Sequence, residues 1–256
     1  MTTEADEVAI EAAVDRLYAQ HRTPHYEQTR SDLVKELDVL ASRDVASVLA
    51  VVERHLQALG GVSPDVDRLN HSLNFFFDFF ESRQSPRIRS FVERALQLSP
   101  FRMKERYIQT LEELGDPDSV RTLVTLLSLH RGDRIEDDDV RVAVLKALTG
   151  YFPPLADPSP VLSVLNDRAL RVRSAALQYL SAHLDARAVP VLAARVQVED
   201  DPDLLVTALD LLGTVAPAKA LTAAEQRLTS TPAGETDIVE PLQLAVGELR
   251  ERSRGL

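Results

Sequence analysis

The sequence predicts an all-α protein, and three observations lead to this class. Apolar residues recur at helical spacing along nearly all of the 256 residues, and no segment shows the two-residue alternation of a half-buried strand. Glycine occurs only 9 times, which is too few for a fold rich in tight β-turns. The apolar pattern of the second half also repeats at a fixed interval, as it does in stacked helical hairpins. We therefore expect about fourteen helices in the chain.

The first half of the chain predicts helices that are joined by short segments. Thr3 can cap the first helix, and Glu4, Asp6 and Glu7 are favoured at its positive end. Pro24 interrupts the helical pattern that follows. The expected helices cover residues 3–20, 31–40, 44–59, 63–80, 86–98 and 101–114.

The second half repeats itself every 32 residues. Val140, Val172 and Leu204 occupy the same place in three helical stretches, at residues 139–148, 171–180 and 203–212. A shorter helix is expected before each stretch, at residues 120–127, 161–165 and 188–196. A two-helix unit of this length cannot bury its apolar face alone, so neighbouring units are expected to stack into one core. The same register aligns Leu145 with Leu177 and Leu209, and Leu148 with Leu180 and Leu212.

Residues 115–214 resemble HEAT repeats, of the short bacterial variety also seen in bilin lyases. Gly115-Asp116-Pro117 opens a first helix, and the pattern Val-Arg-x-Ala-x-Leu-x-x-Leu begins at both Val140 and Val172. The resemblance implies an α-solenoid, a right-handed superhelix of antiparallel helix pairs. It divides the chain into residues 1–114, either degenerate repeats or a helical cap, and residues 115–256, HEAT-like repeats with a divergent capping unit at the C-terminal end. We expect both parts to belong to one continuous solenoid.

Charge and composition narrow the classes of function. The formal net charge of −11 argues against a nucleic-acid binder and against docking on an anionic membrane. The absence of cysteine excludes disulfides, thiolate metal sites and a cysteine nucleophile. The acidic start of the chain does not resemble a secretory signal, and no apolar stretch approaches the length of a membrane span. A cytoplasmic protein is therefore expected.

No residues suggest a catalytic, metal or cofactor site. The acidic runs 136–139 and 199–203 each precede a second helix, where carboxylates are expected to cap the helix rather than bind a cation. Neither a His-Glu-x-x-His pattern nor a Gly-x-Ser-x-Gly elbow is present. The resemblance to bilin lyases keeps open a cofactor chaperone or lyase-type enzyme. A HEAT-like DNA glycosylase is disfavoured by the net charge and by the absence of tryptophan.

Two segments of the first half are candidates for binding a partner. Residues 75–80 hold five of the eight phenylalanines, and Phe75 and Phe79 lie on a different stripe from the others. This pattern fits either a central helix packed on two sides or an exposed aromatic anchor. Residues 83–106 hold seven basic and two acidic side chains, among them Arg87, Arg89 and Arg94. They either pair with neighbouring carboxylates or form a patch for a protein with an acidic surface.

Polar residues also recur at one position of the second helices. Lys146, Gln178 and Asp210 are equivalent in the repeat and are expected on the concave face of the solenoid. Arg141 and Arg173 are equivalent as well, and arginines at this place often bridge to an acidic residue of the next unit in HEAT-like proteins. Arg173 is also a candidate for partner binding. The sequence thus predicts a non-catalytic scaffold that binds another protein.

Overall fold

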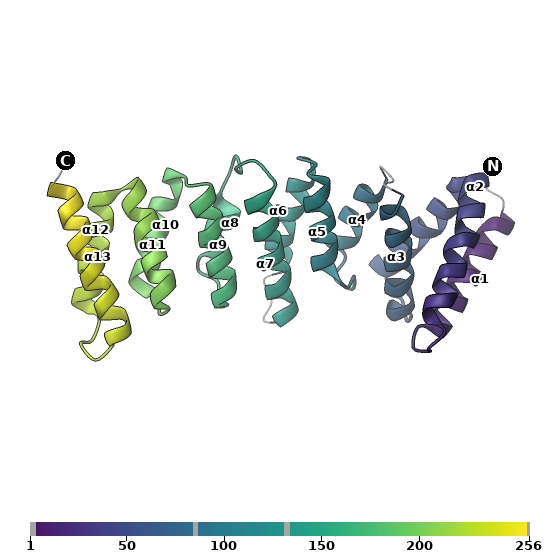
Figure 1. Ribbon diagram of the computed structural model, residues 1–256, viewed down its shortest axis with the longest axis horizontal. Helices are drawn as coiled ribbons and strands as arrows, with labels where there is room; N and C mark the ends of the chain where they lie inside the picture. Colours follow the sequence, from purple (N-terminus) through teal and green to yellow (C-terminus); the bar gives the residue numbers. More distant parts are fainter. Residues whose placement is uncertain (1–3, 84–86, 131–133, 255–256) are drawn as a thin grey trace. The chain divides into compact units, whose positions relative to one another are not determined.

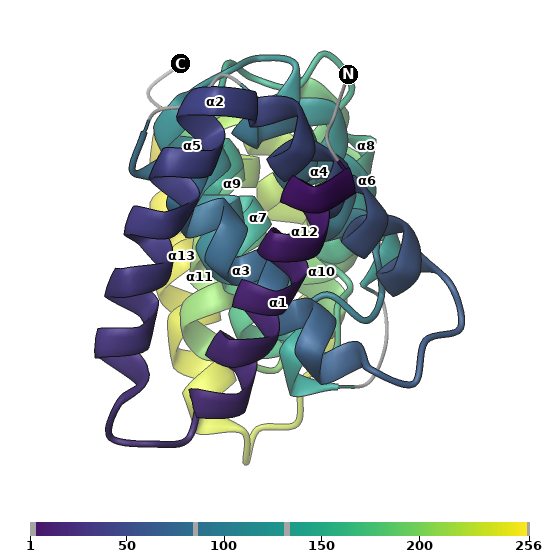
Figure 2. The same cartoon turned by 90° about the vertical axis from the view of Figure 1, so that its right-hand side faces the viewer.

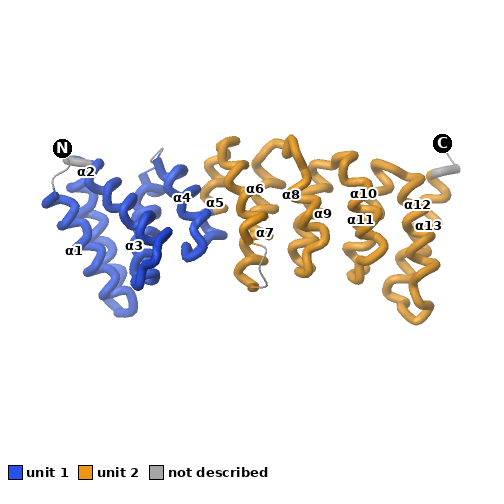
Figure 3. Tube along the Cα trace, turned by 180° about the vertical axis from the view of Figure 1, so that it is seen from behind, with its two compact units in different colours: residues 1–107 blue, residues 108–256 orange. Residues whose placement is uncertain are grey.

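The computed structural model describes residues 4–83, 87–130 and 134–254. Within these ranges the chain forms thirteen α-helices, one short 3-10 helix and no strand, which confirms the predicted all-α class (Figure 1). None of the described helices combines the length and the apolar character that crossing a membrane would require. The chain divides into two compact units, Met1–Tyr107 and Ile108–Leu256 (Figure 3). The predicted division after residue 114 stays a prediction.

Unit 1 begins with an antiparallel hairpin of two helices. The first helix ends four residues before Pro24, as the sequence predicted, and the second helix returns alongside it (Figure 2). The third helix packs against the second and carries the phenylalanine run. The expected cap Thr3 lies outside the described residues. The helices that begin in this unit are α1 (Glu4–Gln20), α2 (Tyr26–Gly60), α3 (Val66–Glu81), α4 (Ile88–Gln97) and α5 (Lys104–Leu114), of which α5 continues into unit 2.

Helix α2 differs from the prediction, because it is one helix of 35 residues where two were expected. The break that the sequence predicted between residues 40 and 44 is wrong. Residues 41–43 are Ala-Ser-Arg and contain neither glycine nor proline, so nothing in them stops a helix. The Ser42 hydroxyl donates to the Val39 carbonyl (2.8 Å) and so satisfies its hydrogen bond within the helix.

Unit 2 is built from sequential helix pairs. In four successive pairs, a first helix packs against the second helix that follows it. The second helices α7, α9, α11 and α13 also contact one another in chain order, and they lie side by side in Figures 1 and 3. This arrangement is a repeat-like stack. The pairs are α6 (Ser119–Leu129) with α7 (Ile135–Gly150), α8 (Ser159–Val164) with α9 (Leu170–Ala182), α10 (Val189–Val198) with α11 (Pro202–Val215), and α12 (Pro217–Ser230) with α13 (Thr236–Arg254); the 3-10 helix η1 (Ala186–Ala188) precedes α10.

The apolar register of the 32-residue repeat forms the core of this stack. All nine aligned apolar positions are buried, none with more than 7% of its surface exposed. The stack therefore buries the face that a single hairpin would leave in water, as the period predicted. The nine are Val140, Leu145, Leu148, Val172, Leu177, Leu180, Leu204, Leu209 and Leu212.

The two acidic runs differ in what they do. Asp201 caps α11, since its Oδ1 accepts from the Leu204 amide (3.0 Å), which confirms the expected role. In the other run, the expected cap is wrong, because α7 already begins at Ile135 and holds residues 136–139 in its first turns. There Asp138 and Asp139 pair with arginine side chains instead.

Candidate functional site

The most regular exposed surface of unit 2 lies on the second helices α7, α9 and α11. Each helix carries one stripe of exposed or half-buried side chains, and the stripes use equivalent residues of the repeat. On α9 this stripe holds Arg171, Ser174 and Gln178, and the apolar side of the helix, from Val172 to Leu180, packs against its neighbours. We call the three aligned stripes the second-helix face, which comprises Asp139, Val142 and Lys146 of α7, Arg171, Ser174 and Gln178 of α9, and Asp203, Val206 and Asp210 of α11.

The sequence predicted three equivalent polar residues on the concave face of a solenoid, and that this face is concave stays a prediction. Lys146, Gln178 and Asp210 are all exposed, in one row of the second-helix face. Beside this row, Arg171 forms an ion pair with Asp139 (2.5 Å) and donates to the Ile135 carbonyl (3.1 Å). This pair links α9 to α7 at the surface. Whether the row binds a partner stays a prediction.

Arg173 is not on this face. Only 6% of its surface is exposed, and its guanidinium contacts Glu199 (2.7 and 3.1 Å) and the carbonyls of Asp167 and Arg168 (3.2 and 3.0 Å). It therefore joins the loop before α9 to the turn before α11, which is the bridging role that the resemblance to HEAT repeats implied. Because its donors are used inside the stack, Arg173 offers no surface to a partner.

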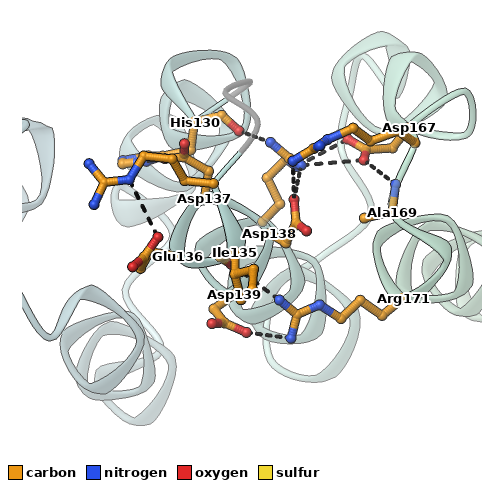
Figure 4. A network of polar contacts seen from close by, with 12 residues as sticks. His130, Ile135, Glu136, Asp137, Asp138, Asp139, Asp167, Ala169 and Arg171 are labelled. Atoms are coloured by element: carbon orange, nitrogen blue, oxygen red, sulfur yellow. Dashed lines mark hydrogen bonds and ion pairs between the residues drawn. The ribbon is translucent and has the colours of Figure 1, made fainter.

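Arg141 occupies the equivalent position one repeat earlier and makes the equivalent contacts. Its side chain is 1% exposed and pairs with Asp138 of its own helix (2.5 Å) and Asp167 of the following loop (3.1 Å). It also donates to the His130 carbonyl at the end of α6. Figure 4 shows dashed lines from the labelled Asp138 and Asp167 to one side chain, and these lines are the two ion pairs of Arg141. The two arginines thus hold successive repeats together from the inside.

Glu199 is the carboxylate that completes the second bridge. It is fully buried between Arg173 and Arg195 (2.8 Å), and it accepts from the amides of Asp200 and Asp201 (3.1 and 3.2 Å). Burial by itself raises the pKa of a carboxyl, but the hydrogen bonds from Arg173 and Arg195 outweigh it and lower the pKa of Glu199 to about 2. Glu199 is therefore ionised at neutral pH.

The arginines of residues 83–106 are largely neutralised by carboxylates, most of them on other helices. Arg94 makes a bidentate pair with Glu53 of α2 (2.6 and 2.7 Å), and Arg89 lies 4.0 Å from Glu93. Arg87 is exposed at the start of α4. Arg83 and Arg102 pair with Asp38 and Asp67. These pairs favour the interpretation in which the arginines pair with neighbouring carboxylates over the interpretation in which they form an open basic patch.

Phe75 and Phe79 are core residues rather than exposed anchors. Each has only 3% of its surface exposed, like their neighbour Phe80. Helix α3 is packed on two sides, which explains why two aromatic stripes follow one helix. The Arg83 guanidinium also lies over the Phe79 ring, 3.7 Å from its centroid. Of the two predicted alternatives, the structure shows the central helix packed on two sides. Neither phenylalanine ring is therefore available to a partner.

One polar arrangement in unit 1 was not predicted from the sequence. Ser72 Oγ lies 2.6 Å from His55 Nδ1, and Glu11 lies 3.0 Å from the other ring nitrogen. These residue types also occur in hydrolase triads, but Ser72 is fully buried and His55 is 3% exposed, so no substrate reaches them. The group instead ties α1, α2 and α3 together. No sequence pattern marks it, because its members come from three helices.

A second histidine cluster of unit 1 is partly exposed. The rings of Tyr18, His21 and Tyr26 surround His71 with centroid distances of 5.5–5.8 Å. His71 Nε2 is buried without a hydrogen-bond partner among the described residues. Burial, and then the charge of His21, lower the pKa of His71 below its usual 6.5.

We expect His71 to make unit 1 less stable in mild acid. The unfolded imidazole gains its proton near pH 6.5, whereas the folded one resists it, so the unfolded state binds more protons and stability falls as the pH drops below about 6.5. His71→Phe should flatten this decrease in urea unfolding curves recorded between pH 7 and pH 5. His25→Phe is the control, because that side chain is exposed. An equal slope in wild type and His71→Phe would contradict the prediction.

Other features of the described residues add no further site. No three His, Cys, Asp or Glu side chains among them are arranged to hold a metal ion. A shallow hollow of about 530 Å³ lies between α12 and α13, where Glu225 and Arg250 pair (2.7 Å), and no predicted site residue lines it. No family model, curated protein or solved structure matches this chain.

Proposed function

We propose that unit 2 is an α-solenoid of HEAT-like repeats that holds a partner protein on the second-helix face, without catalysis. The observation that carries the proposal is the exposure of equivalent polar residues, Lys146, Gln178 and Asp210, on three helices that contact one another in order. Stacking of equal units produces such an extended face, and extended faces of stacked repeats are used for binding.

The buried bridges support this proposal, because they keep the face in one geometry. Arg141 and Arg173 are buried and connect consecutive repeats through carboxylates and loop carbonyls. Binding surfaces that are ordered before the partner arrives lose less conformational entropy on binding. A scaffold therefore gains from clamps of this kind, while an enzyme would in addition need a concave site with convergent polar groups.

Site-specific photo-crosslinking tests the proposal on the intact chain. With p-benzoylphenylalanine in place of Gln178, we expect one prominent adduct in cells, whose partner is then identified by mass spectrometry. The same replacement at Lys219, exposed on the first helix α12, is the matched control and should not give this adduct. Lys146→Glu should weaken the affinity of the purified partner about tenfold, since like charges brought together across an interface repel.

The outcome that contradicts the proposal is equally direct. If the cross-linker at residue 178 gives no adduct, or gives the same adducts as at residue 219, the second-helix face does not hold a partner. If both Lys146→Glu and Gln178→Trp leave the affinity for the partner unchanged, the partner does not bind the second-helix face.

A further inference from the structure

The second-helix face is an ordered array of charges as well as a surface. Its nine residues form three rows that cross α7, α9 and α11. The middle row is Val142, Ser174 and Val206, with short side chains only. The two outer rows hold all the charges of the face: Asp139, Arg171 and Asp203 in one, Lys146, Gln178 and Asp210 in the other.

The two outer rows place unmatched charge at opposite sides of the face. Arg171 is already matched by Asp139 on α7. Lys146, Asp203 and Asp210 form no ion pair with any described residue. The positive charge of Lys146 is thus unpaired on α7, and the negative charges of Asp203 and Asp210 are unpaired on α11. A partner that complements both must present opposite charges in a fixed order.

We infer that the ligand of this face is a linear segment of a partner protein, bound in an extended conformation across the three helices, with an acidic side chain at Lys146 and a basic side chain at Asp210 of the same row. The inference rests on the proposed function and adds the chemistry of the partner. The nine residues of the face specify the order of the charges in the ligand. A binding face without this charge pattern would not specify that order.

The centre of the face favours an extended segment over a helix. The side chains of Ser174 and Gln178 make no hydrogen bond to another described group, so the donors and acceptors of these side chains remain open. An extended backbone has unpaired amide and carbonyl groups that can use them, whereas a helix satisfies its own backbone. The short side chains of the middle row also let the backbone of a bound segment approach the face closely.

Helix packing fixes the spacing of the two charges in the ligand. Packed helices lie about 8–10 Å apart, so α7 and α11 are separated by about 16–20 Å. An extended chain covers about 3.3–3.6 Å per residue. The acidic and basic residues of the bound segment should therefore be separated by about five or six positions.

A peptide selection on the intact protein tests this inference. Random linear peptides of about twelve residues, long enough to span the face, are displayed on phage and selected on the immobilised chain. We expect enriched peptides to carry an acidic and a basic residue about five or six positions apart. In fluorescence anisotropy, Lys146→Glu and Asp210→Lys should each weaken their binding about tenfold, and the control Lys219→Glu should not. The double variant Lys146→Glu/Asp210→Lys should prefer the peptide with its two charges exchanged.

The alternatives give different results. If Gln178→Trp, which covers the centre of the face, abolishes binding but both charge reversals leave it unchanged, the charge order is wrong while the proposed function stands. If Gln178→Trp also leaves binding unchanged, the peptides bind elsewhere, and both the inference and the proposed function lose their support. Enriched peptides that become helical on binding, or a selection without any enriched peptide, would overturn the extended linear segment.

Discussion

Glu199→Ala is expected to lower the free energy of unfolding by about 3–5 kcal/mol. Glu199 is fully buried and bonds both Arg173 and Arg195, so its removal leaves two guanidinium groups inside the stack with their main counter-charge gone. The amides of Asp200 and Asp201 lose their acceptor at the same time. Urea unfolding followed by far-ultraviolet circular dichroism measures the loss.

Asp200→Asn is the matched control for this substitution. Asp200 contacts the same guanidinium at 3.1 Å, but its side chain is 86% exposed. An exposed ion pair contributes at most about 1 kcal/mol, so the control should lose far less than Glu199→Ala. Equal losses in the two variants would mean that Arg173 is not buried in the way the structure describes.

The same bridge makes the protein sensitive to acid in a lower pH range than His71 does. The pKa of Glu199 is about 2 in the folded chain and 4.5 without its surroundings. Its contribution is therefore complete above about pH 4.5 and is lost as the pH falls toward 2. Glu199→Gln should be less stable at neutral pH and should lack this part of the pH dependence.

The 32-residue period made the packing of unit 2 predictable. Residues that align at this interval must face the same direction in every unit, so burial of Val140 implied burial of Val172 and Leu204. The same reasoning placed Lys146, Gln178 and Asp210 in one exposed row. Unit 1 has no such period, and there only the existence of most helices could be predicted.

The candidate residues of unit 1 could not be judged from sequence because their partners are distant. Arg94 is neutralised by Glu53, 41 residues earlier, and Arg83 by Asp38, 45 residues earlier. A local count of charges does not include such partners. The phenylalanine run could not be judged from sequence either, because two aromatic stripes on one helix fit both a buried central helix and an exposed anchor.

Phe79→Ala distinguishes these two meanings of the phenylalanine run. Because Phe79 is a core residue, its truncation to alanine should lower the free energy of unfolding by about 3–5 kcal/mol. The loss comes from the apolar surface that is no longer buried and from the cavity that is left behind. The contact of its ring with Arg83 is lost as well. Phe79→Leu keeps most of the apolar volume and should lose clearly less. Binding of the partner captured through residue 178 should be the same in any fraction of Phe79→Ala that remains folded. Normal stability together with lost binding would instead make Phe79 an anchor, which its burial does not allow in the folded chain.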